Sequence, residues 1–136
     1  MPDAADQDSP RPVLTAAEPQ LFVSDIKASC DFFTVKLGFT IAFVYGDPPF
    51  YGQVCRDGAR LNLRHVDRPV FDSALRKRES LLSAAIAVEG IRQLFREFQS
   101  AGVLFHEALT RQPWGAETFI VEDPDGNLLL FAGRAD

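Results

Sequence analysis

Few side chains in this sequence are suited to catalytic chemistry. The candidates are two histidines, His65 and His106, and two cysteines, Cys30 and Cys55. His106 precedes Glu107, and such a pair could transfer a proton, but adjacent residues of a strand point to opposite faces. His65 has apolar neighbours, and Cys55 has no visible base to activate its thiol. We therefore expect the histidines to be structural or at the surface, the thiols to be free and buried, and no residue to be catalytic.

The composition describes one domain, or two fused half-domains, with a substantial core. The chain has 136 residues, of which 46% are hydrophobic and 12 are phenylalanine. A small domain cannot easily bury that many phenylalanines, so some should line a groove or an interface. The net charge of −5 and the lack of a basic stripe argue against nucleic-acid binding. The short run Arg76-Lys77-Arg78 is expected to be a solvated surface.

No targeting or membrane segment is visible. No apolar run approaches the length of a membrane span. The first residues lack the basic start and apolar stretch of a secretory signal, so a cytoplasmic location is the expectation. Residues 1–17 are rich in proline, aspartate and alanine, and they are expected to form a mobile tail.

The elements that must position any site occur twice along the chain. The patterns predict strands at 19–24, 39–45, 51–56 and 60–66, with a helix after the first strand that carries Ile26, Cys30, Phe33 and Leu37 on one face. The same order returns with strands at 83–88, 103–107, 117–122 and 127–132 and a helix after the first of them. Asp57-Gly58 and Asp125-Gly126 are equivalent turns, 68 positions apart. Each half is a βαβββ unit that cannot bury its sheet alone.

Two such units predict an α+β fold in which two four-stranded sheets carry helices on their outer faces. The predicted boundaries are a first unit at 18–66, a polar linker at 67–80 and a second unit at 81–136, forming one compact domain over 18–136. The clearest local signal is the hairpin at 121–131, where Asp123-Pro124-Asp125-Gly126 has the residue types of a tight turn.

Three stretches of the chain resemble the vicinal oxygen chelate superfamily, which includes glyoxalase I, extradiol dioxygenases, fosfomycin-resistance enzymes and bleomycin-resistance proteins. They are VSDIKASCDFFTVKLGF at 23–39, RDGARLNLRHV at 56–66 and PWGAETFIVEDPDGNLLLF at 113–131. The resemblance covers residues 18 to 133 and implies a cup-shaped mixed sheet with helices outside. The superfamily contains lyases, dioxygenases, transferases and binding proteins, so the resemblance alone does not choose among them.

The resemblance also indicates where the enzymes of this family hold a metal ion. The corresponding positions are Glu18, Asn62, Ser83 and Leu130. Only Glu18 is a good ligand, Asn62 offers a neutral carbonyl oxygen, Ser83 is weak and Leu130 cannot bind a metal. A catalytic ion normally needs about three good protein ligands. The expectation is therefore no bound metal and no cofactor.

In the cup that the resemblance implies, strand alternation places Arg60, Asn62 and Arg64 on the inner face. Aromatic residues at the rim and an apolar far wall would suit a partly aromatic ligand. Trp114, in a loop, is either a stacking platform or a plug of the core. The predicted ligand-binding residues are Phe22, Tyr45, Phe50, Tyr51, Asn62, Arg64, Trp114 and Leu130.

This combination is most similar to the bleomycin-resistance branch, whose members are metal-free dimers that sequester a drug between subunits. It implies a non-catalytic homodimer that binds an antibiotic or another partly aromatic compound. Two alternatives stay open: a divergent metal-dependent lyase or dioxygenase of the same superfamily, and a structural dimer whose cup is filled by its own side chains.

Overall fold

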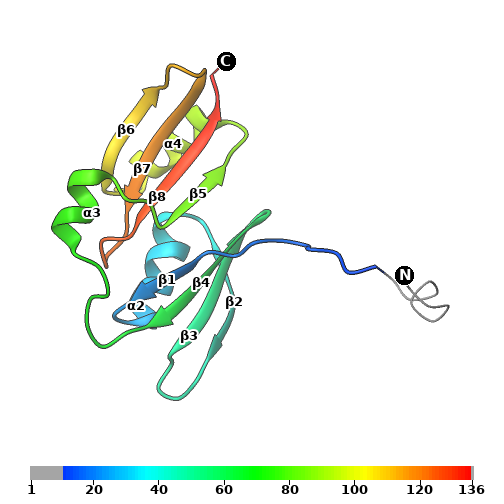
Figure 1. The fold of residues 1–136 in the computed structure, drawn as a ribbon, viewed down its shortest axis with the longest axis vertical. Helices are drawn as coiled ribbons and strands as arrows, with labels where there is room; N and C mark the ends of the chain where they lie inside the picture. Colours follow the sequence, from blue (N-terminus) through cyan, green and yellow to red (C-terminus); the bar gives the residue numbers. More distant parts are fainter. Residues whose placement is uncertain (1–10, 136) are drawn as a thin grey trace, which may run out of the picture.

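The computed structural model describes residues 11–135 as two four-stranded sheets that lie end to end, with helices α2 and α4 behind them (Figure 1). The first unit contains β1 (Gln20–Val23), α2 (Ile26–Asp31), the π-helical turn η1 (Phe32–Lys36), β2 (Thr40–Tyr45), β3 (Tyr51–Arg56) and β4 (Ala59–His65). The helix α3 (Ser73–Glu79) follows. The second unit contains β5 (Ala84–Ala87), α4 (Ile91–Ser100), β6 (Phe105–Arg111), β7 (Ala116–Glu122) and β8 (Leu128–Arg134).

The two sheets have the same topology. The strand order is β1-β4-β3-β2 in the first sheet and β5-β8-β7-β6 in the second. In each, the first strand pairs in parallel with the last, and the other pairs are antiparallel. The predicted α+β fold with two βαβββ units is therefore confirmed.

The ends of the first helical segment are set by local residue types. Asp25 caps α2 by accepting a 3.0 Å hydrogen bond from the Ala28 amide, as the side chain of an N-cap residue does. Gly38 follows the helical segment with φ of +71°, a left-handed conformation that glycine adopts without steric cost. The apolar face between these residues is buried.

Both helices contribute to one continuous hydrophobic core. Phe33 of the first unit and Phe98 of the second are fully buried, and each lies between its helix and its sheet. Phe119 on β7 is the centre of an aromatic cluster, since its ring lies within 6 Å of four other phenylalanine rings, those of Phe95, Phe98, Phe105 and Phe131. Because neither sheet could bury its inner face alone, the shared core holds the units together. Within residues 11–135, no helix is long and apolar enough to cross a membrane.

The connection between the units, residues 67–80, contains α3, whose N-cap Asp72 accepts hydrogen bonds from two amides of its first turn. The expectation of a solvated surface at Arg76-Lys77-Arg78 is wrong for Arg76. Arg76 is not solvated: only 8% of it is exposed, and its guanidinium lies 4.3 Å from the centre of the Phe71 ring. A cation that stacks on an aromatic ring and is also hydrogen-bonded can be buried at low cost. Of the predicted tail, residues 1–10 lie outside the described residues, and residues 11–17 are exposed and form no helix or strand.

The turn after β7 joins the two units through the Asp125 carboxylate, which accepts a 2.9 Å hydrogen bond from the Ser24 amide, and through the buried side chain of Asn127. The Asn127 Oδ1 atom accepts hydrogen bonds from Arg76 (2.9 Å) and Ser83 (3.1 Å). Its Nδ2 atom donates to the Phe22 carbonyl of the first unit (3.1 Å) and to Asp123 (2.9 Å). Asn127 is 2% exposed, so all four bonds are formed away from water. We call this set of bonds the Asn127 clasp.

Asp123 carries a carboxyl group that is buried at the base of the same turn. It accepts hydrogen bonds from the Asp125 amide, the Asn127 amide and the Asn127 side chain. Burial raises the pKa of Asp123 by more than these hydrogen bonds lower it. The pKa is therefore about 6, compared with an ordinary value of 3.8. The folded chain therefore holds this proton more tightly than the unfolded chain does.

Replacing Asn127 by alanine is expected to lower the free energy of unfolding by about 3 kcal/mol, because the buried Arg76 loses its amide partner and the Phe22 carbonyl loses its donor. Urea denaturation followed by circular dichroism measures the change. The control is Gln99→Ala on the exposed surface of α4, which should change stability by less than about 0.5 kcal/mol. An equal effect of both substitutions would mean that the clasp does not stabilise the fold.

The raised pKa of Asp123 has a definite consequence for stability at different pH values. The stability that protonated Asp123 contributes is fully present below a pH of about 4 and is lost as the pH rises through about 6. Relative to the variant Asp123→Asn, the wild-type chain should lose about 2 to 3 kcal/mol of stability between these limits. Urea titrations at several pH values measure the difference. The exposed control Glu89→Gln should follow the wild type, and a wild-type curve parallel to that of Asp123→Asn would contradict the assignment.

Candidate functional site

The face of the first sheet opposite the helices is a polar and aromatic surface built by strand alternation. On β4, Leu61 and Leu63 are 1% and 0% exposed and pack under the helices. Arg60, Asn62 and Arg64 alternate with them and lie on the opposite face, where both arginines are exposed. Because successive residues of a strand point to opposite faces, one strand contributes to the core and to this face at once.

Four side chains of this face form a row across all four strands. The register pairs Phe22 of β1 with Arg64 of β4, Arg64 with Tyr51 of β3, and Tyr51 with Tyr45 of β2. An arginine thus lies between a phenylalanine and two tyrosines. We call these four residues the aromatic row.

Further aromatic rings extend the row at its β2 end. Phe43 stacks on Tyr51 with ring centres 6.0 Å apart, and Phe50 meets Tyr45 edge to face at 5.6 Å. Phe43, Tyr45 and Phe50 are 40%, 68% and 50% exposed. Such exposed rings, gathered on one edge of a sheet, mark a binding surface more often than isolated surface residues do.

The next row along the sheet is polar and internally hydrogen-bonded. It pairs Gln20, Asn62, Gln53 and Phe43 across the strands. Gln53 donates through Nε2 to Asn62 Oδ1 (2.9 Å) and to Glu18 Oε1 (3.1 Å), and its Oε1 accepts from Arg60 (3.1 Å). Tyr51 donates to Gln20 Oε1 at 3.3 Å. These bonds hold the polar side chains in fixed positions next to the aromatic row.

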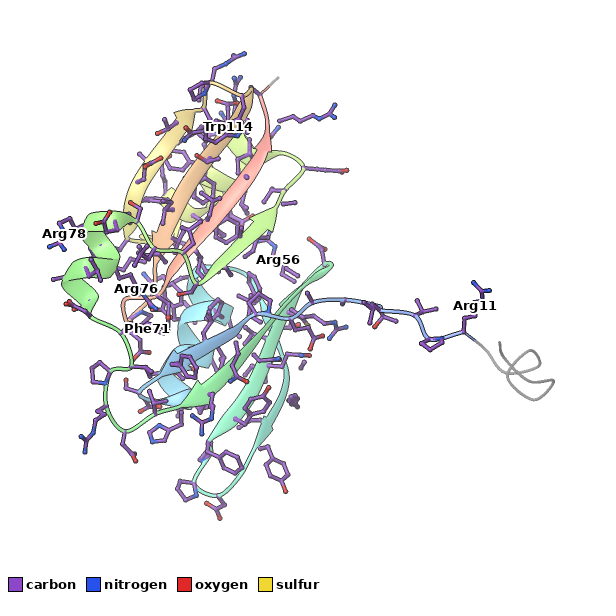
Figure 2. The ribbon with its side chains drawn as sticks, in the orientation of Figure 1. Arg11, Arg56, Phe71, Arg76, Arg78 and Trp114 are labelled. Atoms are coloured by element: carbon purple, nitrogen blue, oxygen red, sulfur yellow. The ribbon has the colours of Figure 1, made fainter. Side chains whose placement is uncertain are left out.

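A small cleft of about 220 Å³ continues the face at the β1 end. Its walls include Phe22, Phe71, Arg68, Arg76 and the turn at 125–127. The rings of Phe22 and Phe71 are 6.0 Å apart, and Figure 2 shows Phe71 and Arg76 together where the two units meet. The Asn127 clasp therefore borders the candidate site.

The structure brings six of the eight predicted ligand-binding residues together on or beside this face, and places two elsewhere. The six are Phe22, Tyr45, Phe50, Tyr51, Asn62 and Arg64. Trp114 lies in the β6–β7 loop at the end of the second sheet farthest from the first (Figure 2). It is 75% exposed, so it does not plug the core. Leu130 lies on β8, half-buried, between Ala85 and Ile120.

The residues at the family's metal positions do not fit a metal ion. Glu18 and Asn62 lie near each other, but one oxygen of each already accepts a hydrogen bond from Gln53. Ser83 donates to Asn127, and Leu130 has no lone pair to offer. No group of three or more histidine, cysteine, aspartate or glutamate side chains that could hold a metal occurs within residues 11–135. One carboxylate and one amide oxygen fall short of the ligand set that a catalytic divalent ion needs.

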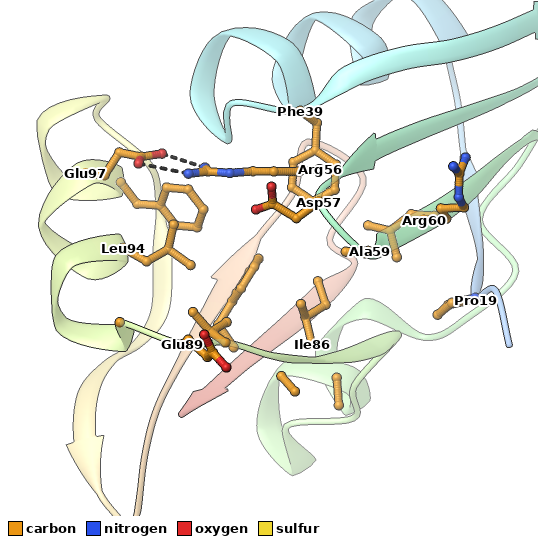
Figure 3. A pocket seen from close by; sticks show the side chains of 18 of the residues that line it. Pro19, Phe39, Arg56, Asp57, Ala59, Arg60, Ile86, Glu89, Leu94 and Glu97 are labelled. Atoms are coloured by element: carbon orange, nitrogen blue, oxygen red, sulfur yellow. Dashed lines mark hydrogen bonds and ion pairs between the residues drawn. The ribbon is translucent and has the colours of Figure 1, made fainter. Parts of the chain in front are cut away.

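A larger cleft of about 1200 Å³ separates the β3–β4 turn from β5 and α4 (Figure 3). Its apolar walls include Phe39, Ile86 and Leu94, and Arg56 bridges it by two hydrogen bonds of 2.6 and 3.0 Å to Glu97. This pair raises the pKa of Arg56 and lowers that of Glu97, chiefly through the hydrogen bonds between them. None of the eight predicted ligand-binding residues lines this cleft. Its charged groups chiefly tie one unit to the other.

The histidines and cysteines have local structural partners. His65 lies 3.0 Å from Asp67, and His106 Nε2 lies 3.1 Å from the Ser80 hydroxyl. Both cysteines are free: Cys30 is buried, as expected, whereas Cys55 is only half-buried, with its sulfur 3.4 Å from the Thr40 hydroxyl. Burial raises the pKa of the Cys30 thiol, which disfavours the reactive thiolate.

The sequence did not identify several residues that complete the face. Gln53 holds the polar row together, and its position on β3 opposite Asn62 follows only from the strand register. Phe43 could have been found from the alternation of β2, because it lies two residues before Tyr45 in continuous register. Phe71 and Arg76 come from the connection that was expected to be polar, so no periodic signal indicated them.

Comparisons with known proteins agree with this architecture. A family model described as the Glyoxalase/Bleomycin resistance protein/Dioxygenase superfamily matches residues 15–131. A bleomycin resistance protein of Geobacillus stearothermophilus is 35% identical over 124 residues, covering 83% of this chain and 92% of that protein.

Solved structures show the same fold. A bleomycin resistance determinant encoded on transposon Tn5 superposes with a TM-score of 0.73 at 20% identity, over 90% of this chain and 100% of that one. A bleomycin-binding protein from Streptomyces verticillus, solved with copper(II)-bleomycin, gives 0.68 at 26% identity, over 93% and 100%. The family match spans both βαβββ units, and the chain therefore belongs to the glyoxalase/bleomycin resistance protein/dioxygenase superfamily.

Proposed function

We propose that this protein binds a small, partly aromatic molecule, such as an antibiotic, without transforming it. The observation that carries the proposal is the aromatic row, where Phe22, Tyr51 and Tyr45 flank Arg64 on an open face. Flat rings stack on such a surface, and the fixed polar row beside it supplies directional contacts. His65, His106 and Cys55 contact structural partners, and Cys30 is buried in the core, so none of these four side chains is placed to act on a molecule at the row.

The proposed binding crevice is shared by two copies of the chain. Trp114 and Leu130 belong to the second sheet, whereas the aromatic row belongs to the first, and the two sheets lie end to end in one chain (Figure 1). A homodimer that sets the first sheet of one chain against the second sheet of its partner would bring them together. The exposure of Trp114 and of the β2 edge supplies apolar surface for such an interface.

The relatives support the class of ligand. The similar proteins named above are described as bleomycin resistance or bleomycin-binding proteins. Sequestration of an antibiotic by stoichiometric binding is therefore the role that we propose here. A cytoplasmic location is part of the proposal, and two unpaired cysteines are compatible with it.

A ligand screen by thermal unfolding tests the binding function. Bleomycin and a panel of aromatic antibiotics are added to the purified protein. A ligand at roughly 100 times its Kd adds about 2.7 kcal/mol, which should raise Tm by about 5 to 10 °C. Trp114 is the only tryptophan, so its fluorescence gives an independent titration. Tyr51→Ala and Trp114→Ala should each weaken binding about tenfold or more, because each removes one stacking surface.

The matched control is Val35→Ala, which truncates a side chain that is 73% exposed on η1, away from the proposed crevice. It should leave the Kd unchanged. A chelator should also leave it unchanged, since the donor set does not fit a metal. No stabilisation by any compound, or binding that is lost on chelation, would contradict the proposal.

A further inference from the structure

We infer that the ligand presents an acidic group, a carboxylate, sulfonate or phosphate attached to an aromatic frame, to Arg64 and Asn62. This inference rests on the proposed function, because it specifies the chemistry of the same face. It follows from the direction of the hydrogen bonds and from the distribution of charge on the first sheet.

The hydrogen bonds fix how the amide groups point. The Glu18 carboxylate can only accept and the Arg60 guanidinium can only donate, so Gln53 must turn its Nε2 toward Glu18 and its Oε1 toward Arg60. The same Nε2 atom donates to Asn62 Oδ1 at 2.9 Å. Asn62 therefore has its acceptor occupied and keeps both N–H bonds of Nδ2 for a ligand.

The neighbouring position adds a cation to this donor. Arg64 is two residues from Asn62 on the same face of β4, and it is exposed. No ion pair or side-chain hydrogen bond of Arg64 is formed with any residue of the described chain, 11–135, in contrast to Arg56 and Arg92, whose guanidinium groups bind Glu97 and Glu117. A planar guanidinium beside an amide donor matches the oxygens of an acidic group.

The charged residues of this face also favour a negatively charged ligand group. Arg60 and Arg64 contribute two positive charges, and Glu18 contributes one negative charge, whose Oε1 atom already accepts from Gln53. The protein as a whole has a net charge of −5, so the excess of arginine here is a local feature and not a consequence of composition. A cationic ligand group would have to lie against Arg64, at a cost in repulsion.

The aromatic frame of the ligand follows from what flanks Arg64. Phe22 lies beside it on one strand and Tyr51 on the other, in direct register. An acidic group bound at Arg64 therefore leaves the rest of a flat molecule over one of these rings. Stacking and charge pairing then act on the same ligand at adjacent positions.

The test compares two fluorescent probes that share one aromatic frame. Anilinonaphthalene sulfonate carries an acidic group, and N-phenyl naphthylamine has the same rings without it. Titration of the wild-type protein should give a Kd for the sulfonate that is about tenfold lower or more than that for the neutral amine. Arg64→Gln and Asn62→Asp should each abolish this preference and leave the Kd of the neutral probe within about twofold.

Asn62→Asp is the more specific of the two substitutions. The aspartate keeps an oxygen to accept from Gln53 and replaces the outward amide donor by a negative oxygen, so the internal network survives. The control Arg96→Gln removes the same charge from the exposed surface of α4 and should keep the preference. Thermal unfolding of each variant confirms that it is folded.

The outcomes separate the two claims. If both probes bind equally well to the wild-type protein, the face binds aromatic molecules and the acidic-group inference is wrong. The same conclusion follows if Arg96→Gln lowers the preference as much as Arg64→Gln does. If neither probe binds and no antibiotic stabilises the protein, the proposed function fails together with this inference.

Discussion

The buried Asn127 side chain connects the two halves of this protein through its hydrogen bond to Phe22, and its three other bonds anchor it to α3 and to the second unit. It also borders the candidate site. The Nδ2 atom binds the backbone of Phe22, which fixes the edge strand β1, while the Oδ1 atom binds Arg76 of α3. Arg76 in turn stacks on Phe71, whose ring contacts that of Phe22. Because one side chain positions both partners, the aromatic surface at this end depends on the same bonds that hold the units together.

Because side chains alternate along β4, this single strand supplies residues to the core on one side and to the candidate binding face on the other. Leu61 and Leu63 are buried in the shared core, whereas Asn62 and Arg64 face outward. The outer face can therefore change its chemistry without disturbing the packing that supports it. In this chain, the family's metal positions include Asn62 and Leu130, and Gln53 donates hydrogen bonds to the Asn62 carbonyl oxygen and to one oxygen of Glu18. The fold is retained, and the face offers donors and rings in place of metal ligands.

Much of the fold could be predicted from the sequence because its signals are local and occur twice. The helix that begins at Asp25 and ends before Gly38, and the turn at Asp123–Gly126, are specified by a few residues whose backbone preferences are strong. The strands of both sheets were also found, because apolar and polar residues alternate along them.

The parts that could not be predicted depend on contacts between distant segments. α3 is short, and its burial rests on Arg76 meeting Phe71 and Asn127, which no periodicity indicates. The role of Gln53 follows from the register of β3 against β4, which the sequence alone does not show. The prediction grouped Trp114 and Leu130 with the residues of the first sheet, because sequence alone does not show how two sheets of one chain are placed.

Mixed dimers test whether two chains share the proposed binding crevice. Tyr51→Ala and Trp114→Ala chains, each defective in binding alone, are co-expressed with different affinity tags and purified as heterodimers. In a crevice that joins Tyr51 of one chain to Trp114 of its partner, one of the two sites regains both aromatic residues. We expect the heterodimer to bind about half an equivalent of ligand per chain with the wild-type Kd. A heterodimer as defective as its parents, or a chain that stays monomeric, would contradict it.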